Sequence, residues 1–378
     1  MEKCPYAKKC GGCQLQNLTY SEQLRMKQVK LIKLLGRFGH VDEIIGMDNP
    51  YHYRNKVQSA FVSKGGKVLS GIYQSSSFKI VPIEKCYLEN EEADSIIATV
   101  RRLCPSFKIK PYNLDTSEGF LRHVLIRKGF ASGEIMVVIV TVQGEFKSKR
   151  SFVNELLRRH PEITTVVWNI NPTSTPLMLG ECSEVLYGNG YISDTLCGLS
   201  FRISPSSFYQ VNPVQTEKLY SLAKKFANLT GNERVIDAYC GTGTIGLTMA
   251  GDCASVTGVE VNSSAIDDAK HNAKENGIRN IKFINADAGK YMEELARSGE
   301  SADVVITDPP RAGCSSTYIR SLLALKPKRI VYISCNPETL ARDLIPLTKY
   351  GYKATKIQPV DMFPHTSHVE SVVCLMIK

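Results

Sequence analysis

The feature that most constrains this fold is a regular alternation of short apolar segments and helical stretches from about residue 231 onward. The apolar segments resemble buried strands: RVIDAYC, SVTGVEV, IKFINAD, ADVVITDPP and RIVYISC. This alternation is typical of an α/β fold with a mostly parallel sheet and helices on both faces. Ligands of such folds bind beyond the carboxyl ends of the strands, so chemistry-bearing residues are expected there.

A glycine-rich turn follows the first of these segments. Gly241, Gly243 and Gly246 have the spacing G-x-G-x-x-G, which lets a cofactor approach the backbone closely. Glu260 ends the next strand, where a carboxylate can hydrogen-bond a ribose. Both features serve nicotinamide dinucleotides as well as S-adenosylmethionine, so an NAD-dependent oxidoreductase remains an alternative at this point.

The motif Asp308-Pro-Pro-Arg311 ends the fourth apolar segment. Its two prolines stiffen the loop and remove N–H donors, which leaves carbonyl groups and a carboxylate facing the expected site. Dehydrogenases have no need of this arrangement, whereas methyltransferases acting on nucleobase-like groups often carry it. A purely structural turn at the end of a strand is the alternative.

Two more residues at strand ends suggest covalent chemistry. Cys335 follows the strand RIVYIS, and Glu370 lies just before the final strand. A thiolate that adds to C6 of uracil makes C5 nucleophilic toward a methyl donor, and a base must then remove the C5 proton. The sequence therefore predicts Cys335 as nucleophile and Glu370 as base. A packing cysteine is the alternative for Cys335, and no ligand spacing supports a metal site at His365, His368 and Glu370.

Three of the twelve cysteines are crowded near the start of the chain. Cys4, Cys10 and Cys13 have the pattern C-x5-C-x2-C, and Cys86 is the best candidate for a fourth ligand. Four thiolates suit zinc or a [4Fe–4S] cluster, and spacing alone does not choose between them. Unligated thiols are the alternative, because the cytosol keeps thiols reduced and disulfides are rare there.

Positive charge is concentrated in the first part of the chain. The net charge is +10, of which residues 1–90 carry +7, residues 91–230 carry +3 and residues 231–378 carry none. A basic front suggests contact with a polyanion, and the aromatic and basic run from Tyr51 to Lys56 suits base stacking and phosphate binding. The alternatives are a solubilising surface and an ordinary edge strand. With no apolar run long enough for a membrane span or a signal peptide, we expect a cytoplasmic protein.

These motifs closely resemble the RNA 5-methyluridine methyltransferase family, particularly its bacterial 23S rRNA (uracil-5-)-methyltransferases. The resemblance extends over nearly the whole chain, in the order CPYAKKCGGCQLQNLTYSEQL, YRNKVQ, LRHVLIR, SFYQVNPVQTEKLY, DAYCGTGTIGL, TDPPRAG, YISCNPETLARDL and FPHTSHVESVV. It implies a C-terminal Rossmann-like S-adenosylmethionine-dependent methyltransferase domain with a mostly parallel seven-stranded sheet. A β-rich central domain and a small iron–sulfur segment would precede that domain, with boundaries at 1–90, 91–230 and 231–378.

The resemblance also implies residue roles. Cys335 would be the nucleophile and Glu370 the base. The residues that contact S-adenosylmethionine or border its pocket would be Gln210, Tyr239, Thr244, Glu260, Asp287 and Asp308. Thr244 and Asp287 stand where some relatives have Asn. Cys4, Cys10, Cys13 and Cys86 would hold a [4Fe–4S] cluster, and the resemblance alone favours iron over zinc.

One departure bears on the substrate. Many relatives begin with a small RNA-binding barrel, the TRAM domain, whereas here Cys4 stands almost at the start. A cysteine cluster without TRAM resembles the short 23S rRNA branch, while the tRNA-specific branch lacks both. The resemblance therefore implies an RNA substrate, 23S rRNA first and the tRNA T-loop as the alternative, with the target base flipped into the pocket. Neither a membrane nor a protein partner is implied.

Overall fold

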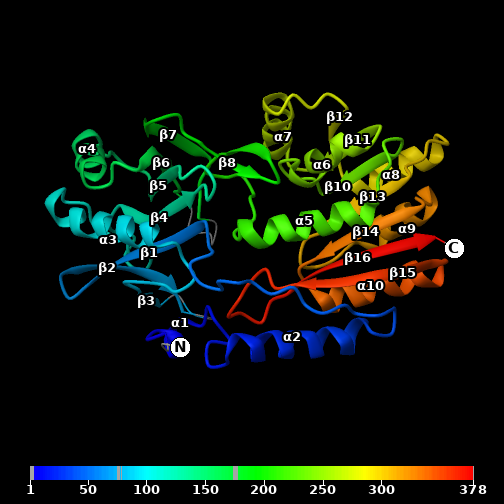
Figure 1. Ribbon diagram of the computed structural model, residues 1–378. Coiled ribbons are helices and arrows are strands. Elements are labelled where there is room, and N and C mark those ends of the chain that lie inside the picture. The colour runs from blue at the N-terminus through cyan, green and yellow to red at the C-terminus, as the bar shows by residue number, and fades with distance from the viewer. Residues whose placement is uncertain (1–3, 75–76, 78, 173–177, 378) are drawn as a thin grey trace.

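The computed structural model describes residues 4–74, 77, 79–172 and 178–377. Figure 1 shows two lobes, each built on a sheet, with the N-terminal helix α2 running beneath the C-terminal lobe. Each lobe contains a seven-stranded sheet, and a two-stranded ribbon lies in the chain between them. No helix of the described residues is both long and apolar enough to cross a membrane.

The first sheet is mostly antiparallel, with one parallel pair, β5 and β6. Its strands, in spatial order, are β3 (Ile80–Pro82), β2 (Lys67–Tyr73), β1 (Lys56–Lys64), β4 (Leu121–Lys128), β5 (Ile135–Thr141), β6 (Ile163–Ile170) and β7 (Cys182–Tyr187). Helices α3 (Glu91–Ser106) and α4 (Lys149–Arg159) pack on it and share one apolar core with it. The sheet starts at Lys56, so it crosses the boundary expected at residue 90.

The second sheet contains all five strands predicted from the alternating pattern. Its spatial order is β12 (Ile281–Asn285), β11 (Ser255–Glu260), β10 (Arg234–Ala238), β13 (Val304–Thr307), β14 (Arg329–Ser334), β16 (Glu370–Ile377) and β15 (Tyr352–Val360). Neighbouring strands from β12 to β14 are parallel, and β16 is antiparallel to both of its neighbours. The start of β16 therefore lies at the edge where β10, β13 and β14 end.

Helices cover both faces of this sheet, as the pattern predicted. On one face, α5 (Pro213–Ala227), α6 (Thr244–Met249), the short 3₁₀ helix η1 (Ala250–Asp252) and α7 (Ser263–Glu275) bury apolar side chains in one cluster. On the other face, a second cluster joins α8 (Ala288–Arg297), α9 (Ser316–Leu325), α10 (Pro337–Lys349) and α2 (Tyr20–Leu35). Continuous burial on both faces explains why the strands are apolar throughout rather than alternating.

Helix α2 packs with the C-terminal lobe, although it lies far from that lobe in sequence. Thr19 and Glu22 form a capping box that starts the helix, and Leu31 and Leu35 are fully buried in the core beside α10. Beyond α2, Asp42 N–H bonds the carbonyl of Ile357 on β15. The segment expected to be a separate N-terminal unit is thus divided between the two lobes.

A β-hairpin and a loop in the middle of the chain connect the two lobes. The hairpin of β8 (Ile192–Leu196) and β9 (Leu199–Ile203) carries Asp194, a buried carboxylate. That carboxylate accepts hydrogen bonds from the backbone N–H groups of Phe130 and Ala131 beside β4. The loop 204–212 then leads into α5, which begins at Pro213 with Asn212 as its cap.

Candidate functional site

Six of the predicted site residues follow the order of the strands across the carboxyl edge of the second sheet. They are Asp287 after β12, Glu260 at the end of β11, Tyr239 after β10, Asp308 after β13, Cys335 after β14 and Glu370 at the start of β16. The sequence separates these residues by up to 131 positions, yet the sheet places them on consecutive strands. This edge is where α/β folds bind ligands.

Cys335 and Glu370 are neighbours across the antiparallel pair of β14 and β16. Ser334 is in register with Ser371, so the next position on each strand brings the thiol and the carboxyl group together. Glu370 is only 4% exposed, while Cys335 is only half-buried. The pair thus combines a reachable sulfur atom with a sheltered carboxyl group.

Burial and repulsion between negative charges set the pKa values of the side chains at this edge. The pKa of Glu370 is raised to about 8, first by burial and then by the negative charge of Asp308, and Arg311 opposes the rise. Burial also raises the pKa of Asp308 to about 7. The pKa of the Cys335 thiol is raised to about 11 by burial, with Glu370 and Asp308 adding to it. A carboxyl group with a pKa this close to neutrality suits general base catalysis.

Arg311 also lies at this edge, although no role was predicted for it from the sequence. Its guanidinium donates to Nδ1 of His368 at 2.7 Å, and its carbonyl oxygen accepts from Nδ2 of Asn336 at 3.0 Å. The loop after β13 is thereby tied to the segments that carry Cys335 and Glu370. Arg311 lowers the pKa of both of those groups against the effect of burial. The motif Asp-Pro-Pro-Arg could have indicated a cation at this edge, because Arg is the one cationic residue in the motif.

The glycine-rich turn packs its backbone against two carboxylates. Gly246 N–H donates to Oδ2 of Asp237 at 2.8 Å, and a Cβ atom at Gly246 would lie 2.9 Å from that oxygen. Gly241 N–H donates to Oε2 of Glu260 at 3.2 Å. Gly243 has φ +81°, a conformation that glycine adopts freely, where the chain turns into α6. Close approach of the backbone is therefore built into this turn.

Two predicted cofactor residues come from outside the row of strand ends. The hydroxyl of Thr244, the first residue of α6, lies 3.0 Å from the buried hydroxyl of Tyr220. Gln210 is half-buried in the loop before α5, and its carbonyl accepts from Nδ2 of Asn55 at 2.9 Å. Within the row, exposed Asp287 caps α8 through Lys290 N–H.

Tyr239 has a strained backbone at the centre of this edge. Its φ is +64°, which is uncommon for a residue with a side chain, and its ring lies 5.2 Å from that of Tyr318. Such strain is retained where the surroundings hold it, and it is frequent at ligand sites.

Comparison with known proteins identifies the group to which this edge belongs. The model of the family tRNA (Uracil-5-)-methyltransferase matches residues 185–378. A protein of Halalkalibacterium halodurans described as an uncharacterized RNA methyltransferase is 44% identical, over 99% of this chain and 83% of that protein. The chain belongs to the tRNA (uracil-5-)-methyltransferase family.

A second relative and a crystal structure extend this likeness to the whole length. An uncharacterized RNA methyltransferase of Bacillus cereus is 43% identical, over 99% of this chain and 82% of that protein. The crystal structure of Pyrococcus abyssi tRNA (uracil-54, C5)-methyltransferase in complex with S-adenosyl-L-homocysteine has a TM-score of 0.81 at 30% identity. It covers 97% of this chain and 86% of that one, which confirms the α/β methyltransferase fold.

The four predicted metal ligands of this methyltransferase lie in one region near the lobe junction. Cys4, Cys10, Cys13 and Cys86 are all half-buried, and Cys13 and Cys86 pack against the same small apolar cluster around buried Tyr53. Burial raises the pKa of Cys13 to about 11, and Cys10 and Cys4 add to the rise. Among the residues that the structure describes, however, no group of three or more His, Cys, Asp or Glu side chains is placed to hold a metal ion.

The aromatic and basic run, whose composition suits base stacking, has a buried tyrosine in it. Tyr53 is 1% exposed, and its hydroxyl donates to the carbonyl of Pro364 at 3.1 Å. The ring of Tyr51 lies 4.8 Å from that of His365. Tyr53 is therefore part of the core, and its proposed stacking role is wrong, whereas the cationic residues Arg54 and Lys56 remain partly exposed.

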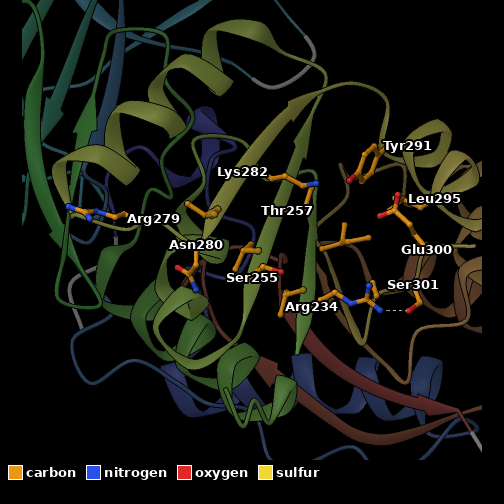
Figure 2. A pocket seen from close by; sticks show the side chains of 15 residues that line it. Arg234, Ser255, Thr257, Arg279, Asn280, Lys282, Tyr291, Leu295, Glu300 and Ser301 are labelled. Atoms are coloured by element: carbon orange, nitrogen blue, oxygen red, sulfur yellow. Dashed lines mark hydrogen bonds between the residues drawn. The ribbon is translucent and has the colours of Figure 1, made fainter. Parts of the chain in front are cut away.

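A cavity of about 320 Å³ opens away from this site. Arg234, Ser255, Thr257 and Lys282 line it at β10, β11 and β12, and Figure 2 shows Arg234 bonded to Ser301 at its wall. None of the predicted catalytic, cofactor or cysteine residues lines this cavity.

The burial of Glu370 predicts a pH-dependent effect on stability. Because its folded pKa of about 8 lies above the value of 4.5 for an exposed glutamate, folding favours the protonated form. This contribution to stability is complete below about pH 4.5 and is lost as the pH rises through 8. We expect Glu370→Gln to raise the melting temperature relative to the unchanged protein, by several degrees at pH 8 and by little at pH 5.

Thermal melts of both proteins at several pH values measure this difference. Glu275→Gln, on the exposed end of α7, is the matched control and should change the melting temperature little at any pH. An effect of Glu370→Gln that does not vary with pH would contradict the raised pKa.

Proposed function

We propose that this protein methylates C5 of a specific uridine in 23S rRNA, with S-adenosylmethionine as donor and a transient bond between Cys335 and C6 of the base. The observation that carries the proposal is the placement of Cys335 beside Glu370, on the same edge as the glycine-rich turn and Glu260. One nucleophile and one base within reach of a single ring are what C5 methylation of uracil requires.

The chemistry assigns a separate task to each residue. Cys335, once deprotonated, adds to C6 and leaves an enolate whose negative charge is shared by C5. C5 then takes the methyl group from the donor's sulfonium, and the bond from sulfur to methyl breaks with its electrons kept by the donor. Glu370 accepts the C5 proton, and the electrons of that C–H bond reform the C5–C6 double bond as the Cys335 thiolate leaves.

The donor site is proposed at Gln210, Tyr239, Thr244, Glu260, Asp287 and Asp308. S-adenosylmethionine supplies a methyl group on a cationic sulfur, and an edge lined by carboxyl groups complements that charge. The carboxylate of Glu260, which accepts from Gly241 N–H, would hydrogen-bond the ribose of the donor. Family membership and the S-adenosyl-L-homocysteine in the Pyrococcus relative favour this donor over a nicotinamide dinucleotide, and so disfavour the oxidoreductase alternative.

The RNA is proposed to reach this edge from the basic N-terminal part, residues 1–90. Asn55 connects the two, because its N–H donates to the carbonyl of Val211 and its side chain donates to Gln210. Arg54 and Lys56 on either side of Asn55 are partly exposed and can neutralise phosphate groups. The target base would leave its stack to enter the pocket.

The tRNA T-loop is the second candidate substrate, because the Pyrococcus structure similar along its length is that of a tRNA (uracil-54, C5)-methyltransferase. The resemblance of the N-terminal cysteines favours 23S rRNA. Methylation of both purified RNAs by the isolated protein, with labelled donor, separates the two. Label on rRNA supports the proposal, whereas label on tRNA alone would replace it with the T-loop.

Removal of the nucleophile is expected to separate binding from catalysis. Cys335→Ala should lower methylation by a factor of about 10³ or more, because a nucleophile that acts as a unit with its base is not replaced by water. Donor binding, measured by calorimetry, should change little. Cys182→Ala, which removes an exposed thiol elsewhere, should keep full activity. Normal methylation by Cys335→Ala would remove the covalent step from the proposal.

Loss of the base should instead arrest the reaction after methyl transfer. Glu370→Gln cannot accept the C5 proton, so the bond from Cys335 to C6 persists. We expect a protein–RNA adduct that survives a denaturing gel and disappears when Cys335→Ala is added to the same chain. If Glu370→Gln is active and its denaturing gel shows no adduct, another group removes the proton.

We further propose that Cys4, Cys10, Cys13 and Cys86 hold a [4Fe–4S] cluster. Cys13 and Cys86 pack against one apolar cluster, Cys4 and Cys10 lie close enough to Cys13 to raise its pKa, and the motif resembles that of the family's iron–sulfur segment; these three features support the assignment. A cluster would supply the cationic centre that keeps four such thiols deprotonated. Anaerobically purified protein should contain about four iron atoms and four sulfides per chain. Cys86→Ser should lose them and Cys182→Ser should keep them; zinc without iron would overturn the proposal.

A further inference from the structure

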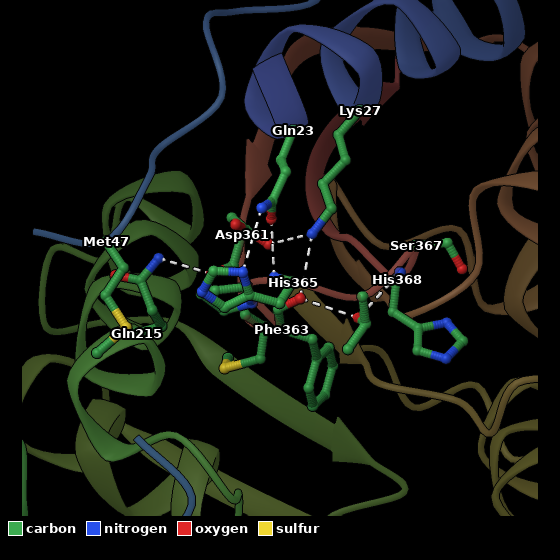
Figure 3. Close-up of polar contacts among 12 residues, drawn as sticks. Gln23, Lys27, Met47, Gln215, Asp361, Phe363, His365, Ser367 and His368 are labelled. Carbon is green, nitrogen blue, oxygen red and sulfur yellow. Dashed lines mark hydrogen bonds and ion pairs between the residues drawn. The ribbon is translucent and has the colours of Figure 1, made fainter. Parts of the chain in front are cut away.

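Helix α2 buries two polar side chains where a helix usually buries apolar ones. Gln23 is fully buried, and the side chain of Lys27 is 1% exposed. Figure 3 shows both reaching from α2 into the loop that follows β15. Nζ of Lys27 lies 2.6 Å from Oδ1 of Asp361, whose side chain is also fully buried, and 3.1 Å from the carbonyl oxygen of Phe363.

Asp361 is the first residue of the loop that leads to the proposed base. Strand β15 ends at Val360 and β16 begins at Glu370, so residues 361–369 set where Glu370 starts. Both carboxylate oxygens of Asp361 are occupied, since Oδ2 accepts from the hydroxyl of Tyr20 at 2.9 Å. The carboxylate of Asp361 is therefore held by α2 through charged and neutral hydrogen bonds, while its backbone N–H donates to Ile45 and its carbonyl accepts from Gln215.

A second contact holds the middle of the same loop. Oε1 of Gln23 accepts from the backbone N–H of His365 at 2.9 Å, and Nε2 of Gln23 lies 3.1 Å from Nδ1 of its ring. His365 has φ +67°, which a residue with a side chain adopts only where its surroundings hold it. Its carbonyl accepts from Leu15 N–H at 3.0 Å, two residues beyond Cys13. The loop is thus fixed by partners from the N-terminal segment.

A buried ion pair is a poor device for stability alone, because apolar side chains of similar volume serve a core equally well or better. What the pair adds is direction, because a short, charge-assisted hydrogen bond fixes the carboxylate of Asp361 against Nζ of Lys27. A general base must lie within hydrogen-bond reach of the proton it removes, and small displacements cost large factors in rate. The loop between Asp361 and Glu370 therefore has to hold Glu370 in a defined position.

We propose that Lys27 and Gln23 are positioning residues, which hold the loop 361–369 so that Glu370 reaches the C5 proton of the bound base. Through them, the N-terminal segment that carries the cysteines and the basic charge becomes part of the catalytic apparatus of the C-terminal lobe. This inference rests on the proposed function, specifically on Glu370 as the base. It predicts a defect in proton removal rather than in donor binding or in attack by Cys335.

The test is the lifetime of the Cys335–RNA adduct in single-turnover reactions at saturating donor and RNA. Lys27→Met should slow adduct decay at least tenfold, so that a protein–RNA band accumulates as in Glu370→Gln, while donor affinity stays within about threefold. Lys33→Met removes the same charge from an exposed position of the same helix and should show ordinary decay. Gln23→Met, which leaves no buried charge unpaired, should slow decay in the same way.

A paired variant separates positioning from folding. Lys27→Met combined with Asp361→Leu removes both charges at once, so the core keeps no unpaired ion and the protein should fold. We expect its melting temperature to approach that of the unchanged protein while adduct decay remains slow. Recovery of the ordinary decay rate together with the melting temperature would overturn the inference and leave the ion pair a structural element.

Glu370→Gln distinguishes this inference from the function on which it rests. If Glu370→Gln accumulates the adduct and the Lys27 and Gln23 variants do not, the positioning role is wrong and the base assignment stands. If Glu370→Gln itself forms no adduct on an RNA that the unchanged protein methylates, the base assignment fails and the positioning role fails with it.

Discussion

Antiparallel pairing of β16 with β14 is the constraint on which the proposed site depends. In an all-parallel sheet, the residue that begins a strand lies at the edge opposite to the residue that ends its neighbour. The reversal of β16 places its first residue, Glu370, beside Cys335 at the end of β14. Strand β15 pairs antiparallel with β16, and residues 361–369 form the turn that connects the two strands. The chemistry is therefore tied to the register of one strand pair.

Charge at this edge is controlled by burial. Asp237, Asp308 and Glu370 are carboxyl groups whose pKa values are raised to about 7, 7 and 8, in each case chiefly because water is excluded from them. The negative charge of Asp308 adds to the rise at Asp237 and Glu370, while burial is the cause of the shift at Asp308 itself. Groups with such pKa values exchange protons close to neutrality, and Arg311 is the cation that limits the rise at Glu370. Burial and the charge of Asp308 raise the pKa of Glu370 and Arg311 lowers it, and the resulting pKa suits the proposed general base.

The N-terminal segment is joined to the C-terminal lobe more closely than its sequence position implies. Leu31 and Leu35 of α2 lie in the core shared with α10, and Lys27 of the same helix contacts Asp361. The cysteine-bearing stretch and the loop before Glu370 also contact each other directly, since Ser367 N–H donates to Gln14. A region that resembles an accessory domain therefore supports the residue proposed to complete catalysis.

The sequence by itself determined the α/β class, the five buried strands and the residues at their carboxyl ends, because strand periodicity and strand-end motifs are local properties. Cys335, Asp308 and Glu260 could be named for that reason, and Glu370 because it stands at the start of the final strand. The sequence could not reveal the ion pair of Lys27 with Asp361, the hydrogen bond of Gln23 with His365 or the burial of Tyr53. Each of these contacts joins segments more than 300 positions apart, and no local pattern marks a buried polar contact. Only tertiary packing decides which polar side chains lose water and which partners they meet, and that packing placed α2 against the loop that carries the proposed base.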